Sequence, residues 1–453
     1  MLCVYDWFYV IDVLDDSLQM IPLQELESRI TSVVLDVAKR LKTGNPAIPI
    51  SVLSADDRNQ WTENLAYLLS LSPANHDTFT AIKHSIFALS LDPYTYVRSS
   101  RSQAPSLPQP DTDNEIDDHL HNLRSSHPGH PARNRWWDKP LNIIVESNTR
   151  AGAIGEHSVC DALVPSIVTE YAVVQGIDDD AFGGPLVLGA SDDSLVANAT
   201  LDGWRRLDWV TDKHIEDECV AAEKRAKALT DDSDDTVLWF SQYGAGWIKN
   251  IARQSPDAYI QMALQLAWYR TRGTVTATYE TALTRLFHHG RTETIRSLSS
   301  DSHAFVLAMG ESSTTVEARR ALLQRAIQTH TNLTRAASTG KGIDRHLLGL
   351  RLMLQANHGE RHELLDDELF SRSQTWKLST SGLSAGHQFR GTGFGSPEAD
   401  GYGINYLAGL DIVKFGIESK HSCPLTSTAI FKDAVSQAML DMRALFQYHK
   451  SNL

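Results

Sequence analysis

The stretch LNIIVESNTRAGAIGEHSVCDAL, residues 141–163, decides the fold class of this chain. Four of its first five residues are apolar, and the run is bounded by turn-forming residues, a pattern typical of a buried strand. A glycine-studded turn follows and carries one histidine, His157, beside a glutamate. Glycines let a backbone turn sharply and approach another group closely, and strand ends are where scaffolds present reactive side chains. The stretch therefore predicts a strand end that presents His157.

Helical and strand-like patterns alternate on both sides of this stretch. Residues 8–13 have the apolar pattern of a strand, and residues 21–44 and 57–71 have the periodicity of helices. The chain becomes strongly helical after about Gly203, and residues 431–448 form its last predicted helix. These alternating patterns predict an α/β fold.

The helix predicted at residues 255–270 has clear start signals. Ser255 stands at the N-cap and Pro256 at the first helical position. Four apolar residues fall on one stripe of this helix: Tyr259, Met262, Ala263 and Leu266. The pattern predicts an amphipathic helix with one buried face.

The length of 453 residues exceeds that of one ordinary hydrophobic core. We expect two domains, residues 1–202 and 203–453, with the boundary at the change to the helical pattern. Residues 99–134 are rich in Ser, Pro, Asp and His, a composition too polar to bury a core. This segment is predicted to be a long mobile surface loop.

Charge and cysteine content exclude several classes of protein. The net charge of −14 argues against nucleic acid as a partner, and no apolar run approaches the ~20 residues of a membrane helix. The four cysteines have neither pair spacing nor metal-ligand spacing, which predicts reduced thiols inside the cell and no metal site. The final residues, Ser451 to Leu453, differ in one position from the Ser-Lys-Leu peroxisomal address, and peroxisomal, mitochondrial and cytoplasmic locations stay open.

His157 has a plain alternative and a functional one. A histidine in a turn is commonly a partly exposed hydrogen-bonding residue. An imidazole with a pKa near neutrality can also take a proton from a thiol or hydroxyl and return it. Asp161, four residues on, is placed to orient the ring or its loop.

A cationic cluster lies in the stretch YGAGWIKNIARQSPD, residues 243–257. Lys249 and Arg253 precede a helix N-terminus there, and positive charge combined with unpaired backbone amides suits a phosphate. The alternative is that both are solvated surface charges. The stretch matches neither a P-loop nor a dinucleotide fingerprint.

Residues 276–297 are too polar for a simple core helix and contain Tyr279, Arg285, Arg291, Thr292 and Arg296. Further on, Arg345 stands beside an apolar helix face. A buried arginine needs an anionic partner or ligand, so either a structural salt bridge or a ligand site is expected at Arg345. Three hydroxyl residues follow one another at Ser379, Thr380 and Ser381. Taken alone, they have the pattern of an ordinary strand edge.

Seven stretches in one order resemble the carnitine and choline acyltransferase family, and the resemblance extends from about Leu2 to Leu445. They are GEHSVCDA, SPDAYIQMALQLAWYR, TYETALTRLFHHGRTETIRS, GIDRHLLGL, KLSTS, DGYGINY and AMLDMRALF. The resemblance implies two similar chloramphenicol-acetyltransferase-like α/β domains that face each other across a central tunnel. It also implies that the chain lacks the family's N-terminal segment, so the first domain is expected to be incomplete.

The resemblance assigns chemical roles to individual residues. It implies that His157 is the general base of a reversible acyl transfer between CoA and carnitine. Ser381 would stabilise the oxyanion, with Ser379 and Thr380 beside it. Arg345 would pair with the carnitine carboxylate, an interaction that choline cannot make because choline has no carboxylate.

The remaining assignments concern the two substrates. The resemblance implies that Tyr279 and Thr292 aid carnitine binding. Four residues are implied to bind CoA: Lys249, Arg253, Asp257 and Thr281. The position that limits acyl chain length falls on Thr392 or Gly393, and threonine there predicts acceptance of acetyl and propionyl groups with tolerance for somewhat longer chains.

Two functions are therefore expected. The first is a carnitine O-acyltransferase of the acetyltransferase type, a monomer that uses CoA as co-substrate and needs no metal or bound cofactor. The second is a truncated, non-catalytic paralogue that binds CoA or folds poorly. Retention of the site residues favours the first, and the missing front segment favours the second.

Overall fold

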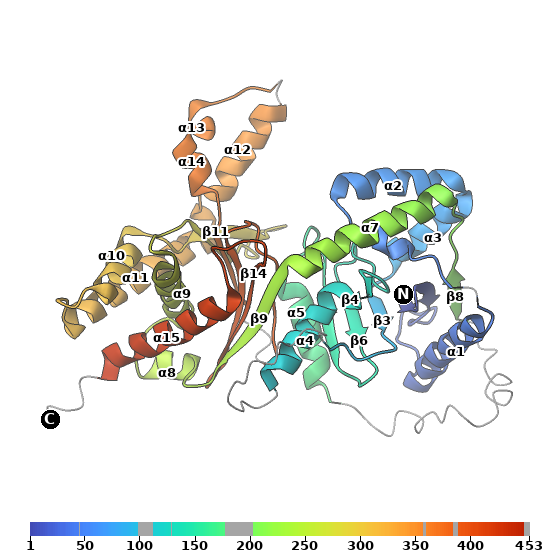
Figure 1. The fold of residues 1–453 in the computed structure, drawn as a ribbon, viewed down its shortest axis with the longest axis horizontal. Helices are drawn as coiled ribbons and strands as arrows, with labels where there is room; N and C mark the ends of the chain where they lie inside the picture. Colours follow the sequence, from blue (N-terminus) through green and yellow to red (C-terminus); the bar gives the residue numbers. More distant parts are fainter. Residues whose placement is uncertain are drawn as a thin grey trace. The chain divides into compact units, whose positions relative to one another are not determined.

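The computed structural model describes residues 1–44, 46–97, 112–127, 129–176, 203–356, 359–383 and 388–447. The chain divides into two compact units, which together hold two six-stranded mixed sheets (Figure 1). The first unit comprises Met1–Leu107 and Asp118–Asp231, and the second comprises Pro108–Asp117 and Asp232–Leu453. The division between the compact units thus falls at Asp231–Asp232, later in the sequence than the boundary predicted near Gly203. The assignment of a function to each domain stays a prediction.

The sheet of the first unit has the strand order β7-β6-β3-β1-β2-β8. Its strands are β1 (Leu2–Val4), β2 (Trp7–Ile11), β3 (Ala88–Leu91), β6 (Asn142–Val145), β7 (Ala151–Ile154) and β8 (Trp204–Leu207). Strands β6, β3 and β1 are parallel, and the others pair antiparallel. The helices in this half are η1 (Ile50–Ala55), α1 (Leu23–Lys42), α2 (Arg58–Leu71), α3 (Pro73–His84), α4 (Thr112–Ser125), α5 (Leu163–Val174) and α7 (Lys213–Asp232), and a short ladder joins β4 (Ser126–His127) to β5 (His130–Pro131).

The sheet of the second unit has the strand order β11-β10-β12-β13-β14-β9. Its strands are β9 (Ser233–Phe240), β10 (Thr278–Leu283), β11 (Thr292–Arg296), β12 (Leu378–Leu383), β13 (Tyr402–Ala408) and β14 (Val413–Lys420). Its helices are α8 (Ala245–Asn250), α9 (Pro256–Arg272), α10 (Ser300–Gly310), α11 (Val316–Ala336), η3 (Ala337–Lys341), α12 (Asp344–Ala356), α13 (Glu363–Asp366), α14 (Glu368–Ser373) and α15 (Thr428–Gln447). Strands β10, β12 and β13 are parallel, and the others pair antiparallel.

The two sheets share one pattern of strand pairing. Each has three parallel strands at its centre, one antiparallel strand on one side and two on the other. The chain visits the positions in a different order in each sheet, so the likeness lies in the pairing and not in the connections. The predicted α/β class is confirmed. The tunnel and the incompleteness of the first domain stay predictions.

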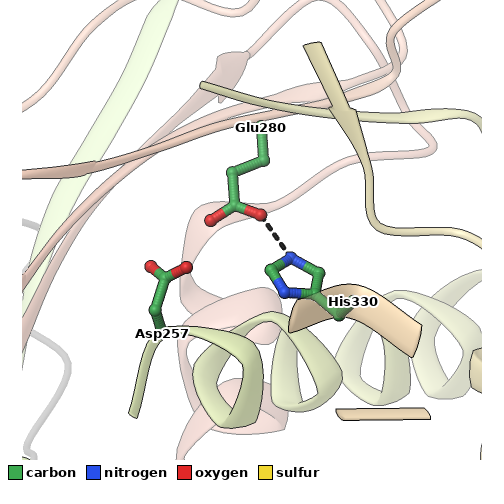
Figure 2. A group of neighbouring side chains, drawn as sticks. All are labelled: Asp257, Glu280 and His330. Carbon is green, nitrogen blue, oxygen red and sulfur yellow. Dashed lines mark hydrogen bonds and ion pairs between the residues drawn. The ribbon is translucent and has the colours of Figure 1, made fainter. Parts of the chain in front are cut away.

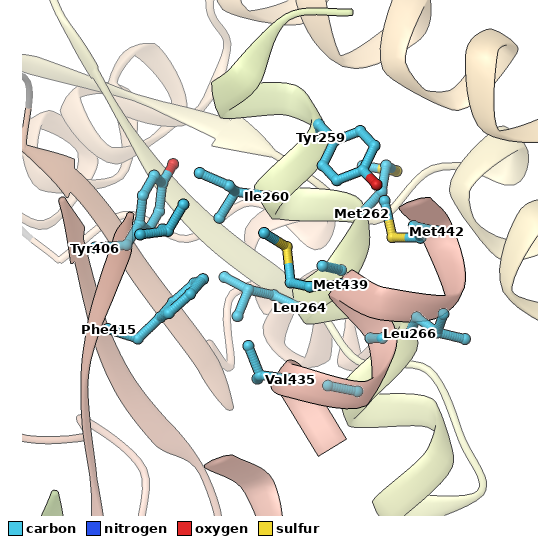
Figure 3. Close-up of a cluster of buried hydrophobic side chains, with 14 of the residues drawn as sticks. Tyr259, Ile260, Met262, Leu264, Leu266, Tyr406, Phe415, Val435, Met439 and Met442 are labelled. Atoms are coloured by element: carbon cyan, nitrogen blue, oxygen red, sulfur yellow. The ribbon is translucent and has the colours of Figure 1, made fainter. Parts of the chain in front are cut away.

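The core of the second unit forms around α9. All residues of this helix from Ala258 to Trp268 are buried, and α9 packs against α10 and α11. Figure 3 shows its side chains packed against those of α15. Met439 and Met442 of α15 and Phe415 of β14 are fully buried in the same cluster. Burial of one such side chain stabilises the fold by about 1.5–3 kcal/mol. The start at Pro256 is confirmed, but the prediction of a single buried stripe is wrong because neighbouring elements enclose the helix on every side.

The segment predicted as a loop at residues 99–134 contains a helix. Residues 98–111 and 128 lie outside the described residues, but α4 covers Thr112–Ser125. Ile116 and Leu120, four positions apart on α4, are 3% and 8% exposed. These two apolar residues bury one face of a helix despite its polar composition, so the loop prediction is wrong there.

Other predictions made from the sequence can be compared with the structure. The helices predicted at 21–44, 57–71 and 431–448 correspond to α1, α2 and α15. All four cysteines are free thiols. Among the described residues, the helices are too short or too polar to cross a membrane. The final residues, Ser451 to Leu453, lie outside the described residues.

Candidate functional site

The stretch around His157 folds as a hairpin followed by a loop. Strand β6 turns back through Thr149, whose φ is 66°, into β7, the edge strand of the first sheet. Gly152 therefore lies in a strand, opposite Ile144, and the prediction of a single glycine-rich turn is wrong. The close approach expected of the glycines is present at Gly155, where a Cβ would lie 2.2 Å from the carbonyl oxygen of Pro140.

His157 lies on the loop that follows β7. Its side chain is 71% exposed, and its Nδ1 lies 3.1 Å from the carbonyl oxygen of Cys160. A carbonyl oxygen only accepts hydrogen bonds, so this contact requires the proton on Nδ1 and leaves a lone pair on Nε2 of the neutral ring. Asp161 Oδ1 is 3.8 Å from Nδ1, too far for a hydrogen bond, so the Cys160 carbonyl is the nearer partner and the orienting role of Asp161 stays a prediction.

Most predicted site residues of the second unit share one face of its sheet. Side chains alternate along a strand, and residues directly opposite each other in a ladder point to the same face. Tyr279 is opposite both Arg296 of β11 and Ser379 of β12. The residues on this face are Tyr279, Thr281, Thr292, Thr294, Arg296, Ser379 and Ser381. We name them the hydroxyl face.

Ser381 occupies the β12 end of the hydroxyl face. It pairs with Asn405 of β13, whose amide donates to the Ser381 carbonyl at 3.3 Å. The Ser381 side chain is half-buried, and its hydroxyl makes no hydrogen bond within the described part of the chain. The hydroxyl is therefore able to donate to a ligand.

Arg345 reaches the hydroxyl face from the N-terminus of α12. Its Nη2 donates to the Tyr279 hydroxyl at 3.2 Å. The preceding residue, Asp344, pairs with Arg296 at 2.6 Å, so the salt bridge in this region belongs to Arg296. The guanidinium of Arg345 has no carboxylate partner among the described residues. Sequence reasoning expected a buried Arg345, but the residue is exposed because α12 leaves the sheet at this point.

A cavity of about 220 Å³ opens beside Arg345. Its walls include Thr294, Arg345, Arg351, Phe370, Gln374 and Trp376. Thr294 is 6% exposed, and its hydroxyl has no hydrogen-bond partner in the described residues. The cavity thus combines two cationic side chains, an aromatic wall and the Thr294 hydroxyl with one carboxylate, that of Asp344. Because Asp344 is paired with Arg296, the remaining positive charge suits a small ligand with an anionic group.

Thr380 and Asp257 lie on the opposite, buried face of the sheet. The Thr380 hydroxyl donates to the Tyr279 carbonyl at 2.8 Å and accepts from Gln261 at 2.9 Å. Tyr406 of β13 donates to the Asp257 carboxylate at 2.5 Å. These two predicted site residues are therefore separated from the hydroxyl face by the sheet itself.

Asp257 belongs to a buried ionisable network that the sequence did not reveal (Figure 2). Glu280 Oε1 lies 2.8 Å from the same Tyr406 hydroxyl, and Glu280 Oε2 contacts His330 Nε2 at 2.5 Å. Burial raises the pKa of Asp257 to about 7, and the Glu280 charge adds to this shift. Burial alone would lower the pKa of His330, but the charge of Glu280 and the hydrogen bond to it raise that pKa overall. The one signal in the sequence was the alternation of side chains along β10. It points Glu280 to the face opposite that of Tyr279, and therefore into the core.

This network is the one group among the described residues with the donor atoms for a metal ion. Asp257, Glu280 and His330 each offer one ligand atom, and these atoms lie within 4.8 Å of one another. Carboxylate oxygen and imidazole nitrogen suit a divalent transition metal. Glu280 and His330 are already hydrogen-bonded to each other, and Asp257 is hydrogen-bonded to Tyr406. The absence of a metal stays the prediction.

The predicted phosphate cluster is open to solvent. Lys249 and Arg253 are exposed, and neither makes an ion pair or hydrogen bond to the described residues. The backbone amides of Ala245 and Gly246 donate to the carbonyls of Gly409 and Leu410. These amides belong to α8, whereas the helix that Lys249 and Arg253 precede is α9. Its N-cap residue, Ser255, makes no side-chain cap hydrogen bond, so a phosphate site at this N-terminus stays a prediction.

Thr392 and Gly393 lie against the hydroxyl-face side of β14. A Cβ on Gly416 would lie 1.6 Å from the Thr392 carbonyl oxygen. Gly416 is opposite Asn405, which is opposite Ser381, so these three residues form one row across the sheet. The backbone of Thr392 therefore passes over the same face as the Ser381 side chain, two strands away and thus about 10 Å from it.

Comparisons with known proteins identify the family of this chain. A family model described as Choline/Carnitine o-acyltransferase matches residues 2–437. Carnitine O-acetyltransferase from Homo sapiens is 34% identical over 88% of this chain and 60% of its own length. The muscle isoform of carnitine O-palmitoyltransferase 1 from Homo sapiens is 34% identical over 89% of this chain and 50% of its own length.

The chain thus spans about half of the length of these curated relatives or somewhat more. The family model nevertheless covers almost all of the chain, including every motif that carries the resemblance except the last, AMLDMRALF at residues 438–446. The protein belongs to the choline/carnitine O-acyltransferase family.

Proposed function

We propose that this protein catalyses the reversible transfer of a short-chain acyl group between CoA and carnitine. The observation that carries the proposal is Arg345, whose guanidinium lacks a carboxylate partner in the described residues and donates to Tyr279 on the hydroxyl face. A cation with an unused anion-binding capacity, beside several hydroxyl groups, suits a substrate that carries a carboxylate. Carnitine has such a carboxylate and choline has none.

His157 is proposed as the general base. Its Nδ1 proton faces the Cys160 carbonyl, which leaves the Nε2 lone pair to take the proton of the carnitine hydroxyl. The carnitine oxygen then attacks the thioester carbon of acyl-CoA, and the Ser381 hydroxyl stabilises the oxyanion. Collapse of this intermediate breaks the carbon–sulfur bond, and His157 returns the proton to the CoA thiolate.

CoA is proposed to act as a co-substrate, with no cofactor held permanently. Lys249 and Arg253, both exposed and without protein partners in the described residues, are the proposed contacts for its phosphates, and Thr281 lies on the hydroxyl face with Tyr279. Asp257 would act from the buried side of β10 through its network with Glu280. Thr292, on the hydroxyl face, is proposed to aid carnitine binding.

The test is a carnitine-dependent release of CoA from acetyl-CoA by the purified chain. His157→Ala is expected to lower kcat about 10²–10⁴-fold while CoA binding is retained. His84→Ala, which changes an exposed histidine at the end of α3, is the matched control and should keep full activity. Near-normal turnover of His157→Ala would contradict the proposal.

A non-catalytic paralogue that binds CoA is the alternative function. In that case the purified chain would bind CoA without releasing it from acetyl-CoA. We further propose that the protein is a monomer in a peroxisomal, mitochondrial or cytoplasmic location.

A further inference from the structure

The position of Arg345 depends on how α12 is attached to the sheet. Arg345 is the second residue of α12, and this helix begins beside the edge strand β11 (Figure 1). A shift of the helix start would move the guanidinium relative to Tyr279. The contacts between β11 and the first residues of α12 therefore decide where the cation lies.

Glu293 of β11 holds the first turn of α12 through the backbone. Its carboxylate oxygens accept the Arg345 amide at 3.2 and 3.3 Å, and Oε1 also accepts the Thr294 amide at 2.6 Å. Glu293 is 6% exposed and has no cationic side-chain partner among the described residues. A carboxylate beside a helix N-terminus is stabilised by the unsatisfied amides and the helix dipole. The negative charge of Glu293 thus stabilises the backbone amide of Arg345 and not its guanidinium.

Gly342 makes room for this carboxylate. A Cβ on Gly342 would lie 2.2 Å from Glu293 Cγ and 2.6 Å from its Oε2. The φ of Gly342 is −71°, which any residue can adopt, so the requirement for glycine at this position is one of space. A side chain on Gly342 would push Glu293 away from the helix.

A second contact runs in the opposite direction. Asp344, the first residue of α12, accepts from Arg296 of β11 at 2.6 and 3.1 Å. The strand thus holds the helix through Glu293, and the helix holds the strand through Asp344. The two contacts involve the residues directly before and at Arg345, so they fix both the direction and the start of the helix.

We propose that Glu293 is a positioning residue that sets carnitine affinity by holding the backbone of Arg345. This inference rests on the proposed function. Glu293 lies on the face opposite Thr292 and Thr294, so its effect on the substrate passes through α12.

The test compares Glu293→Gln with the wild-type chain in carnitine and acetyl-CoA kinetics. The change is expected to raise the carnitine KM about tenfold while kcat and the acetyl-CoA KM stay within about twofold, because a remote binding contact is weakened. In an Arg345→Asn background, Glu293→Gln should cause no further rise in the carnitine KM. An unchanged carnitine KM, or an additive effect in that background, would overturn the proposal.

Glycine substitutions provide a second, independent variant. Gly342→Ala should reproduce the effect of Glu293→Gln with Glu293 still present. Gly349→Ala, within α12 itself, is the matched control, because nothing lies within 4 Å of its Cβ position, and it should leave the carnitine KM unchanged. Equal effects of the two glycine variants would overturn the proposal.

Hydrogen exchange separates this inference from the proposed function. Loss of the Glu293 carboxylate should speed exchange of the Arg345 amide whether or not carnitine is the substrate. If the wild-type chain transfers no acyl group to carnitine, the proposed function fails and the substrate part of this inference falls with it. If transfer is present but the exchange rate does not change in Glu293→Gln, the positioning role alone is refuted.

Discussion

Arg345 and Tyr279 are joined in two ways: the guanidinium donates to the phenol oxygen at 3.2 Å, and its central carbon lies 5.8 Å from the ring centre. Both residues come from elements that are far apart in the sequence, α12 and β10. A hydroxyl that accepts from a guanidinium directs its own proton elsewhere, so the pair presents both a cation and a donor to an anion. The pair therefore has the chemistry to bind a carboxylate.

Arg345→Asn is expected to raise the carnitine KM far more than it lowers kcat, because a contact to a remote carboxylate is lost from both ground and transition states. A charge-assisted contact of this kind is typically worth about 1.5–3 kcal/mol, which corresponds to a rise of roughly 10- to 150-fold. Steady-state kinetics with carnitine and choline are the measurement. The preference for carnitine over choline should narrow.

Arg361→Asn is the control for this change, since Arg361 is 78% exposed and, among the described residues, forms an ion pair with the surface carboxylate of Asp366 alone. An unchanged carnitine KM in Arg345→Asn would contradict a contact between Arg345 and the carnitine carboxylate and would leave Arg345 with a structural role.

Ser381 and Thr380 are neighbours with opposite expected behaviour. Ser381→Ala should lower kcat about 10²-fold or more with little change in stability, because it removes an oxyanion donor on the hydroxyl face. Thr380→Val should instead lower the free energy of unfolding by about 1–2 kcal/mol, because it removes the partners of the Tyr279 carbonyl and the Gln261 amide. Kinetics and urea unfolding of both variants check the pair. If Thr380→Val stayed fully folded in the assay and still lost most of its kcat, Thr380 would act in catalysis. The assignment of Ser381 and Thr380 to opposite faces of the strand, with different roles, would then be contradicted.

The sequence predicted the elements of this fold better than it predicted their surroundings. Apolar periodicity and the start signal at Pro256 identified α9, yet its buried polar residues Gln261 and Gln265 belong to a helix enclosed on all sides. Periodicity counts apolar residues, and it cannot reveal that Gln265 donates to Thr278 at 2.8 Å inside the core. Partners distant in sequence decide whether a polar residue is buried.

The site was predictable only as a set of candidates. The sequence pointed to Tyr279, Thr292, Arg345 and Ser381 as site residues, and the second sheet brings Tyr279, Thr292 and Ser381 to one face, with Arg345 at its edge. Glu293 was missed because its role depends on a helix that begins some fifty residues later. Asp257 and Thr380 were grouped with the others because sequence spacing does not show which side of a strand a tertiary partner occupies.

The buried network of Asp257 predicts a pH-dependent stability. Its folded pKa of about 7 is above the unfolded value of 3.8, so the folded state binds more protons between these values. The free energy of unfolding contributed by this group therefore falls as the pH rises from about 4 to about 7. The raised pKa of His330 acts in the same direction, since its contribution is complete below 6.5 and is lost as the pH rises through the folded value.

Urea unfolding of the purified chain between pH 5 and pH 7 measures this dependence. Asp257→Asn, which keeps an acceptor for Tyr406, should flatten the slope and stabilise the protein most at the upper end of the range. An exposed carboxylate such as Asp217, which is 63% exposed, serves as the control in Asp217→Asn. A slope that is the same in the wild type and in Asp257→Asn would show that the network does not hold its proton.

Acyl chain length is expected to depend on the segment that passes over Gly416. The backbone of Thr392 fills the space of a missing side chain on Gly416, in the same row as Asn405 and Ser381. Thr392 is therefore about 10 Å, or two strand spacings, from Ser381, beside which the thioester is proposed to lie. Threonine is small but branched at Cβ, so it narrows a pocket without closing it.

We therefore expect kcat/KM to be highest for acetyl and propionyl groups, with slower transfer of somewhat longer chains. Each methylene that a pocket buries contributes up to about 0.8 kcal/mol, so an open pocket would produce a steady rise from acetyl-CoA to octanoyl-CoA. Thr392→Met should abolish activity on the longer chains and spare acetyl-CoA, because a longer side chain occupies the same space. Thr392→Gly should do the reverse and extend the range. A rise that continues through palmitoyl-CoA in the wild type, with no effect of Thr392→Met, would show that the acyl chain does not pass this segment.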